Sequence, residues 1–244
     1  MSLHGKRIAM CFSGQARAVK YCFESISNNL LAPLGKVDIF IHSWFIDPLE
    51  RNKFDIFHLN IIDASLDEYV EMYRPVASLF EDFERSTYFR FNNMKERIRI
   101  MFYSMNRANE LKSQYELDQG FKYDYVIRGR TDLFLRKPII PEQLYWLDDN
   151  SVLIPSGFDF GGINDQMAIG TSLAIDKYAS IHKMLDRYLL DDGQQYDPER
   201  LMKHHLEREG FGIRRIDFDY GIIKKKMKYH MGPTFVSLDD IGEK

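Results

Sequence analysis

The stretch YDYVIRGRTDLFLRKP, residues 123–138, combines the features of a core strand with a group of charged side chains. It begins with closely spaced apolar side chains, as a buried strand does. Arg128, Arg130 and Asp132 follow at alternate positions before the sequence becomes apolar again. An extended run that reaches Asp132 would place all three charges on one side, because alternate side chains of a strand point the same way. Lone buried charges are costly, so the three form either an internal salt bridge or part of a cleft.

A long amphipathic helix is predicted immediately before this strand. From Met94 onward, apolar side chains recur three or four positions apart as far as Tyr115, and Gly120 ends the pattern. The stripe is rich in methionine, and we interpret it as core packing.

Strands and helices alternate through the N-terminal half of the chain. Strands are predicted at residues 7–12 and 37–41, with a helix between them at residues 16–31. This alternation predicts a mainly parallel α/β sheet flanked by helices. The C-terminal half is less regular, and its predicted elements are a strand at 151–154, helices at 175–190 and 198–210, and a strand at 213–216. Without an evident linker or repeat, a single domain over residues 1–244 is expected.

The composition excludes several classes of protein. A formal charge of −3 gives no general attraction to nucleic acid or to an anionic membrane. Cys11 and Cys22 are too few for a disulfide framework and favour a reducing compartment. No run of about 18 apolar residues predicts a membrane span, and the N-terminus lacks the features of a signal peptide. We therefore expect a cytoplasmic protein with no nucleic-acid partner.

Three polar clusters follow predicted strands. They are Ser13-Gly14-Gln15-Ala16-Arg17, His42-Ser43-Trp44 and Arg128-Gly129-Arg130-Thr131-Asp132. Ligands of open parallel sheets bind beyond the carboxyl ends of the strands, so the three clusters are expected to form one site. The first cluster enters a predicted helix, whose free N–H groups suit an anion. An ordinary strand-to-helix turn is the alternative.

The third cluster contains two arginines and one carboxylate. Two guanidiniums and one carboxylate leave a surplus cation, for which a phosphate is a natural partner. Because Arg130 lies further along the predicted strand, we expect it to bind the ligand while Arg128 pairs with Asp132. A purely structural salt bridge remains the alternative.

Three blocks of this sequence resemble GT-A-fold glycosyltransferases of the bacterial and viral type. YDYVIR (123–128), which follows a long helix and precedes an acidic motif, resembles the middle of that fold. RIAMCFSGQAR (7–17) resembles its first strand and nucleotide-contacting loop, and GGINDQMAIGTSLAIDKY (161–178) resembles its acceptor-side loop and following helix. The resemblance implies a GT-A-like, Rossmann-related domain that transfers a sugar from a UDP- or GDP-linked donor to a glycan or glycolipid, as in polysaccharide biosynthesis. The donor-binding residues that it implies are Ser13, Gly14, Gln15, Arg17, Arg128, Arg130 and Asp132.

The acidic motif departs from the pattern of that family. GT-A enzymes commonly carry Asp-x-Asp, which binds a divalent metal and the donor diphosphate. Here R-x-R-x-D takes its place, and Arg130 stands where the first aspartate is expected. Asp132, with Asp165 as a second carboxylate, would hold Mn²⁺ or Mg²⁺ together with phosphate and water oxygens. Alternatively, arginine neutralises the leaving diphosphate and no metal is required.

An inverting glycosyltransferase needs a base for the acceptor hydroxyl. Asp165 is our candidate, because it lies in the glycine-rich segment 161–166, where a substrate can approach the backbone closely. A turn or N-cap aspartate is the alternative reading, and Asp159 is a weaker candidate base. The altered acidic motif favours a second function, a noncatalytic nucleotide- or glycan-binding module on the same fold. An enzyme of another α/β family is a third.

Overall fold

The computed structural model describes residues 3, 5–45, 61–82, 94–224 and 235–237. Within these residues, a central sheet of seven strands has the order β3-β2-β1-β4-β7-β6-β8. Its strands are β1 (Ile8–Gln15), β2 (Val37–Phe45), β3 (Ala77–Asp82), β4 (Tyr125–Gly129), β6 (Ser151–Pro155), β7 (Ala168–Gly170) and β8 (Gly212–Ile216). All are parallel except β7, which runs antiparallel to β4 and β6. The predicted mainly parallel α/β sheet is confirmed.

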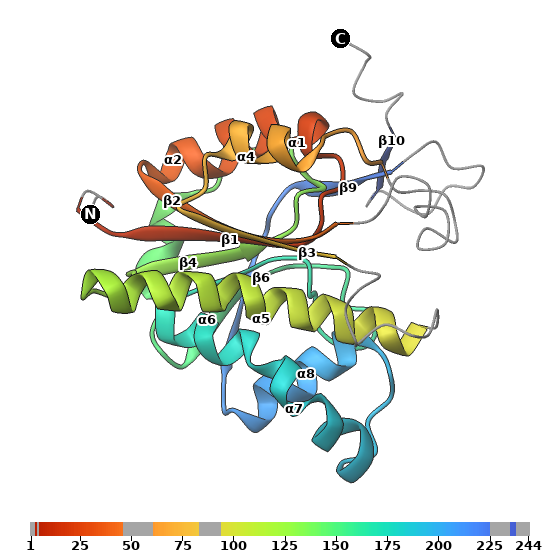
Figure 1. Cartoon of the computed structure of the whole chain (residues 1–244). Helices are drawn as coiled ribbons and strands as arrows, with labels where there is room; N and C mark the ends of the chain where they lie inside the picture. Colours follow the sequence, from red (N-terminus) through yellow and green to blue (C-terminus); the bar gives the residue numbers. More distant parts are fainter. Residues whose placement is uncertain (1–2, 4, 46–60, 83–93, 225–234, 238–244) are drawn as a thin grey trace.

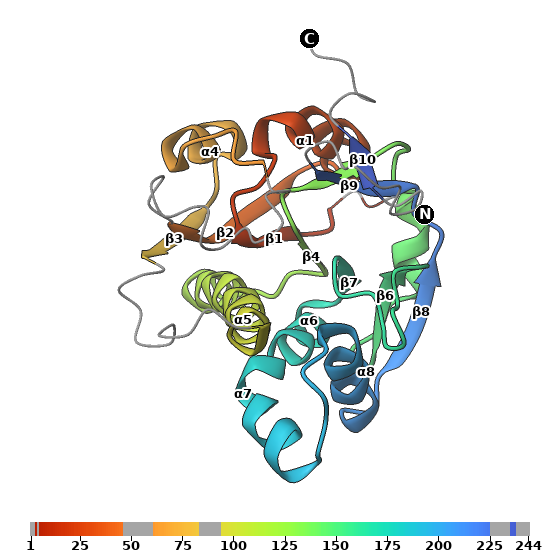
Figure 2. The same ribbon diagram turned by 90° about the vertical axis from the view of Figure 1, so that its right-hand side faces the viewer.

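Helices cover both faces of this sheet (Figures 1 and 2). The helices of one face are α1 (Val19–Ile26), α2 (Ala32–Leu34) and α4 (Leu66–Tyr73), with a π-helical turn at Ser27–Leu31. Those of the other face are α5 (Met94–Gln119), α6 (Ser172–Ala179), α7 (Ile181–Asp186) and α8 (Pro198–Arg208). A smaller sheet, β10 (Phe235–Ser237), β9 (Tyr220–Lys224) and β5 (Leu133–Leu135), lies beside the first layer.

Alternate side chains of β1 pack into two different cores. Ile8, Met10 and Phe12 belong to the core beneath α1 and α4. Ala9 and Cys11 belong to the core beneath α5. Because helices cover both faces, this central strand is a continuous apolar run rather than an alternation of polar and apolar residues.

The apolar stripe of α5 faces the second core, as predicted. Ile98, Phe102, Met105 and Ala108 recur at helical spacing and are all buried. The stripe is therefore core packing. The helix ends at Gln119, and Gly120 follows in a left-handed conformation that suits glycine.

Several elements differ from the sequence prediction. β1 and β2 extend to Gln15 and Phe45, so polar residues expected in loops belong to strands. The helix predicted at residues 175–190 is divided at Ser180 into α6 and α7. β7 was not predicted, because its three residues give no periodic signal.

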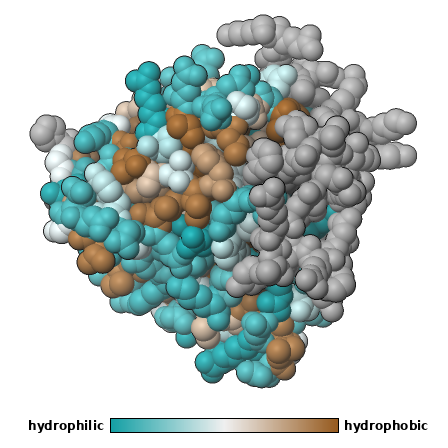
Figure 3. Space-filling model, viewed as in Figure 1, coloured by the Kyte–Doolittle hydropathy of each residue, from teal (hydrophilic) through white to brown (hydrophobic). Residues whose placement is uncertain are grey.

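The surface in the view of Figure 1 is mainly polar. Figure 3 shows apolar side chains gathered in a band between the two helix layers. The edge strand β3 lies between those layers, and its residues are mostly half-buried. Among the described residues, none of the helices combines the length and apolar character that crossing a membrane requires.

Candidate functional site

The carboxyl ends of β1, β2 and β4 meet at one edge of the sheet. Phe12 pairs with Gly129 at the end of β4, and Gly14 pairs with Ser43 of β2. The three polar clusters are therefore neighbours in space, because the strands that carry them are parallel and adjacent. The candidate site begins at this edge.

Arg130 and Asp132 form a two-pronged ion pair at the end of β4. Arg130 donates from Nε to Asp132 Oδ1 at 2.8 Å and from Nη2 to Oδ2 at 2.7 Å. Asp132 is buried, and Lys224 Nζ lies 3.9 Å from Oδ2. Burial opposes ionisation, but the Arg130 and Lys224 charges outweigh it and hold the pKa of Asp132 well below its ordinary range.

This pairing reverses the predicted roles of the two arginines. The expectation that Arg128 pairs with Asp132 and leaves Arg130 for a ligand is wrong as to the pairing. The alternation argument required an extended chain as far as Asp132, but β4 ends at Gly129 and a turn follows. The turn brings Arg130 onto Asp132, while Arg128 makes its hydrogen bonds to Ser13 and Asp165.

Arg128 is buried and is held by uncharged oxygens. Its Nε donates to Ser13 Oγ at 3.3 Å, and its Nη1 donates to the backbone carbonyl of Asp165. Within the described part of the chain, no carboxylate forms an ion pair with it. Burial lowers the pKa of Arg128, whereas the nearby Tyr178 and Asp165 side chains act in the opposite direction.

Asp165 lies in a loop that is held by hydrogen bonds between buried polar side chains. Asn164 Nδ2 donates to the Tyr220 hydroxyl at 2.8 Å, and that hydroxyl donates to Gln166 Oε1 at 2.9 Å. Asp165 is thus fixed between two braced neighbours. Burial raises the pKa of Asp165, and the positive charges of Arg128 and Arg130 oppose the rise. Asp165 caps neither adjacent helix, because Thr171 caps α6 and Asp197 caps α8.

Glu199, in the first turn of α8, is the residue that sequence reasoning missed. Ile163 N donates to the Glu199 carbonyl at 3.0 Å, and a Cβ at Gly162 would lie 2.1 Å from the Glu199 carbonyl carbon. Only glycine permits this contact, which brings Glu199 close to Asp165. Burial, and then the Asp165 charge, raise the pKa of Glu199 to about 7.

The glycine-rich loop therefore has a different use from the one expected. We predicted that its glycines let a substrate approach, but at Gly162 the backbone of α8 occupies that space. Asp159, the weaker candidate base, accepts from Asn164 N at 2.9 Å and from Arg215 Nη1 at 2.9 Å. It braces the loop. The sequence predicted a helix at residues 198–210 but did not indicate a partner for Glu199.

The first turn of α1 already has an acidic partner. The Tyr21 N–H donates to Asp63 Oδ2 at 3.0 Å, and the Ala18 N–H donates to the Ile61 carbonyl at 2.8 Å. Burial raises the pKa of Asp63, while backbone N–H groups, that of Tyr21 first, oppose the rise. The N–H groups expected to receive an anion thus have partners from the segment that precedes α4.

The loop between β1 and α1 instead ties β1 to the end of β4. Arg17 N donates to Thr131 Oγ1 at 3.1 Å, and Arg17 Nε donates to Gln15 Oε1 at 2.8 Å. Ser13 accepts the bond from Arg128. Ser13, which lies in β1 and was predicted to bind the nucleotide-sugar donor, therefore contacts the Arg128 guanidinium directly.

The His42 cluster anchors α5 to the sheet. His42 Nδ1 lies 2.7 Å from Ser104 Oγ, and Nε2 lies 2.8 Å from Glu81 Oε2. Ser104 is buried and also accepts the Gly14 N–H at 2.6 Å. Burial lowers the pKa of His42, and Glu81 opposes this shift. Ser104 has no exposed surface, so this serine–histidine–carboxylate chain is an internal brace.

A divalent metal at Asp132 would lie against the Arg130 guanidinium. Both carboxylate oxygens accept from that guanidinium, whose positive charge disfavours a second cation on the same carboxylate. Over the described ranges, no cluster of three or more His, Cys, Asp or Glu side chains has the arrangement of a metal site. Mn²⁺ or Mg²⁺ stays a prediction from the resemblance, and the residues around Asp132 do not fit it.

Comparison with known proteins places the chain in a family. No curated protein matches it. The profile described as "Domain of unknown function (DUF7796)" matches residues 3–239 and so includes every residue of the candidate site. The chain belongs to the DUF7796 family, whose description assigns no activity.

Proposed function

We propose that this protein is a glycosyltransferase with a GT-A-like fold. It would transfer a sugar from a UDP- or GDP-linked donor to a glycan or glycolipid. One observation carries the proposal. A buried arginine at the carboxyl edge of a parallel sheet has no described carboxylate partner, and it lies near Asp165, whose pKa is raised and whose charge in turn raises the pKa of Glu199.

Arg128 is the proposed ligand for the donor diphosphate. A guanidinium has five N–H donors in a planar fork that matches phosphate oxygens. The described residues accept from Nε and Nη1 of Arg128, and none accepts from Nη2. Ser13, Gly14, Gln15 and Arg17 lie on the β1 side of this guanidinium, where the nucleoside part of the donor would extend.

Asp165 is the proposed base, with Glu199 beside it. The acceptor oxygen attacks the anomeric carbon, and the bond from that carbon to the diphosphate oxygen breaks. The electron pair leaves with the diphosphate, whose charge Arg128 stabilises. The hydroxyl proton passes to a carboxylate of the pair. A base is most effective when its pKa lies near the working pH. Burial raises the pKa of Asp165 above its ordinary value and raises that of Glu199 to about 7.

In this scheme the Arg130–Asp132 pair shapes the end of β4 and carries no chemical step. Thermal shift with and without Mn²⁺ tests whether a divalent metal binds through the donor diphosphate.

A noncatalytic nucleotide- or glycan-binding module is the second candidate. The observation that favours it is Asp132, whose two oxygens are both occupied by Arg130 at the position where a metal ligand is expected. Arg128 would then hold a nucleotide without turnover.

The decisive experiment measures binding and transfer separately. Thermal shift with UDP, GDP and their sugars, with and without Mn²⁺, reports binding, because a ligand at a hundredfold its Kd adds about 2.7 kcal/mol to the free energy of unfolding. Release of nucleoside diphosphate in the presence of mixed glycan acceptors reports transfer. Binding with transfer supports the enzyme, and binding without transfer supports the module. No binding at millimolar nucleotide rejects the enzyme and a nucleotide-binding module, and leaves a glycan-binding module.

A further inference from the structure

A row of aromatic rings leads from the candidate site to the surface. Phe160 is 64% exposed, and its ring lies 6.4 Å from that of Phe158 in an edge-on contact. Phe158 in turn lies 5.5 Å from the Tyr220 ring at an angle of 34°. Tyr220 is buried, so the row has one anchored end and one exposed end.

The backbone that carries this row is strained. Phe158 has φ 60° and Phe160 has φ 41°, both in the left-handed region that bulky residues rarely adopt. Such a conformation is unfavourable for a bulky residue and persists only when surrounding contacts impose it. Those contacts exist. Asp159 between the two rings is bonded to Arg215 and to the Asn164 N–H, and Asn164 also donates to the Gly157 carbonyl at 2.9 Å.

The inner end of the row contacts the two neighbours of Asp165. The Tyr220 hydroxyl is bonded to Asn164 and Gln166, the residues on either side of Asp165. The charges of both Arg130 and Asp165 act on the pKa of that hydroxyl, which burial raises to about 12. In the proposed function, the acceptor hydroxyl must reach Asp165, so the acceptor would enter on the side of this loop.

We propose that Phe160, supported by Phe158, is the platform on which a sugar ring of the acceptor glycan stacks. This inference rests on the proposed function and assigns its acceptor side. An aromatic face is apolar and electron-rich, and the C–H face of a pyranose is apolar with its hydrogens slightly positive. Stacking buries both faces, and a ring held by a braced backbone loses little conformational freedom on binding. The polar groups around Asp165 then receive the hydroxyl that reacts.

The test uses the full chain and a glycan array of α- and β-linked oligosaccharides, read without donor. Phe160→Ala is expected to lose binding about tenfold or more, while Phe160→Trp retains it. The matched control is Leu117→Ala. Leu117 is 74% exposed near the C-terminal end of α5, at the opposite edge of the sheet.

The outcomes are distinct. Equal glycan binding by wild type and Phe160→Ala, or no binding by wild type, overturns the platform. If Phe160→Ala loses the thermal shift with UDP or GDP but still binds glycan, the sugar platform is overturned. Phe160 would then stack on the nucleobase of the donor. Absence of any nucleotide shift in wild type rejects the proposed donor site, and the array still tests the platform by itself. Retention of binding in Phe160→Trp excludes a folding defect as the cause of the loss.

Discussion

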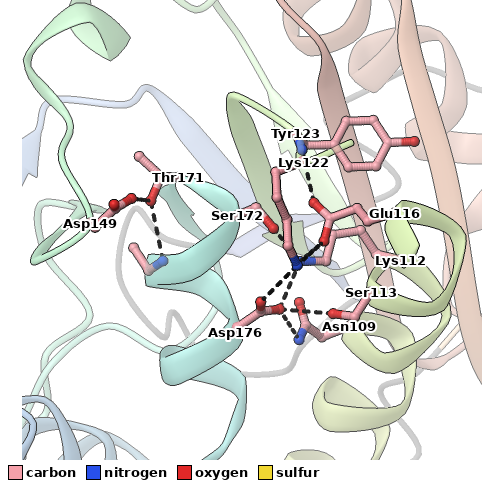
Figure 4. Close-up of polar contacts among 11 residues, drawn as sticks. Asn109, Lys112, Ser113, Glu116, Lys122, Tyr123, Asp149, Thr171, Ser172 and Asp176 are labelled. Carbon is pink, nitrogen blue, oxygen red and sulfur yellow. Dashed lines mark hydrogen bonds and ion pairs between the residues drawn. The ribbon is translucent and has the colours of Figure 1, made fainter. Parts of the chain in front are cut away.

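Two clusters of buried charge lie on neighbouring elements of this protein and differ in how they are paired. In the first, on α5, Lys112 is fully buried and its Nζ lies 2.7 Å from Ser172 Oγ, 2.7 Å from Asp176 Oδ1 and 3.3 Å from Glu116 Oε2 (Figure 4). Glu116 Oε1 accepts the Tyr123 N–H at 2.8 Å. This network joins α5 to α6 and to the residues that lead into β4.

The second cluster contains Arg128, at the end of β4. Its two described partners are a hydroxyl and a backbone carbonyl, and burial raises the pKa of the nearby Asp165 carboxyl group. Burial of a charge is costly in both places. The Lys112 network offsets that cost with opposite charges and so is explained by stability alone. The Arg128 cluster lacks such an explanation, which makes it the better candidate for binding an anion.

The largest expected effect is on turnover in Asp165→Asn. The substitution removes the proposed base but keeps the backbone carbonyl that accepts from Arg128. Transfer should fall by about 10²–10⁴-fold, with the nucleotide Kd unchanged. Steady-state kinetics and calorimetric titration measure the two quantities. Asp159→Asn is the comparison and should lose less activity, because it weakens the brace of the loop but leaves the proposed base in place. Loss of activity in Asp159→Asn alone would move the base to that residue.

Lys112→Met tests the structural cluster. It leaves Asp176 and Glu116 without their buried cation, and removing one partner of a buried pair costs about 3–5 kcal/mol. Urea unfolding should show this loss. Lys122→Met removes an exposed partner of the same Glu116, 2.7 Å away, and should cost less than about 1 kcal/mol. Similar small losses in both variants would contradict the closed-network interpretation.

Arg128→Lys tests the open cluster. Lysine keeps the charge but loses the fork, so nucleotide affinity should fall on the order of tenfold or more, with little change in Tm. Arg130→Lys is the comparison. It weakens the two-pronged contact with Asp132, so it should lower Tm while the nucleotide Kd changes less. The reverse pattern would restore Arg130 as the ligand-binding residue.

The last expected effect is a pH dependence of stability that comes from Glu199. Its pKa rises from an ordinary 4.5 to about 7 in the folded protein, so the folded state binds more protons than the unfolded state between these values. Stability is therefore lost as the pH rises through this window. Urea unfolding at about pH 5 and about pH 8 should show a smaller difference for Glu199→Gln than for wild type. Identical differences would show that Glu199 does not titrate in this range.

The sequence by itself was sufficient for the parallel sheet, for the core stripe of α5, and for the convergence of three polar clusters at one edge. These features follow from periodicity and from the alternation of strands and helices, which are local in the chain. Local pattern also placed Arg128, Arg130 and Asp132 near one another, but it did not determine which arginine pairs with Asp132.

Only the tertiary structure decided which charged groups are partners. The turn after Gly129 pairs Asp132 with Arg130, and the close contact at Gly162 brings Glu199 near Asp165. Neither follows from spacing, because a partner distant in the sequence is chosen by how whole elements pack. The site depends on such choices, since the burial and neighbouring charges that tune its carboxyl groups come from segments far apart in the chain.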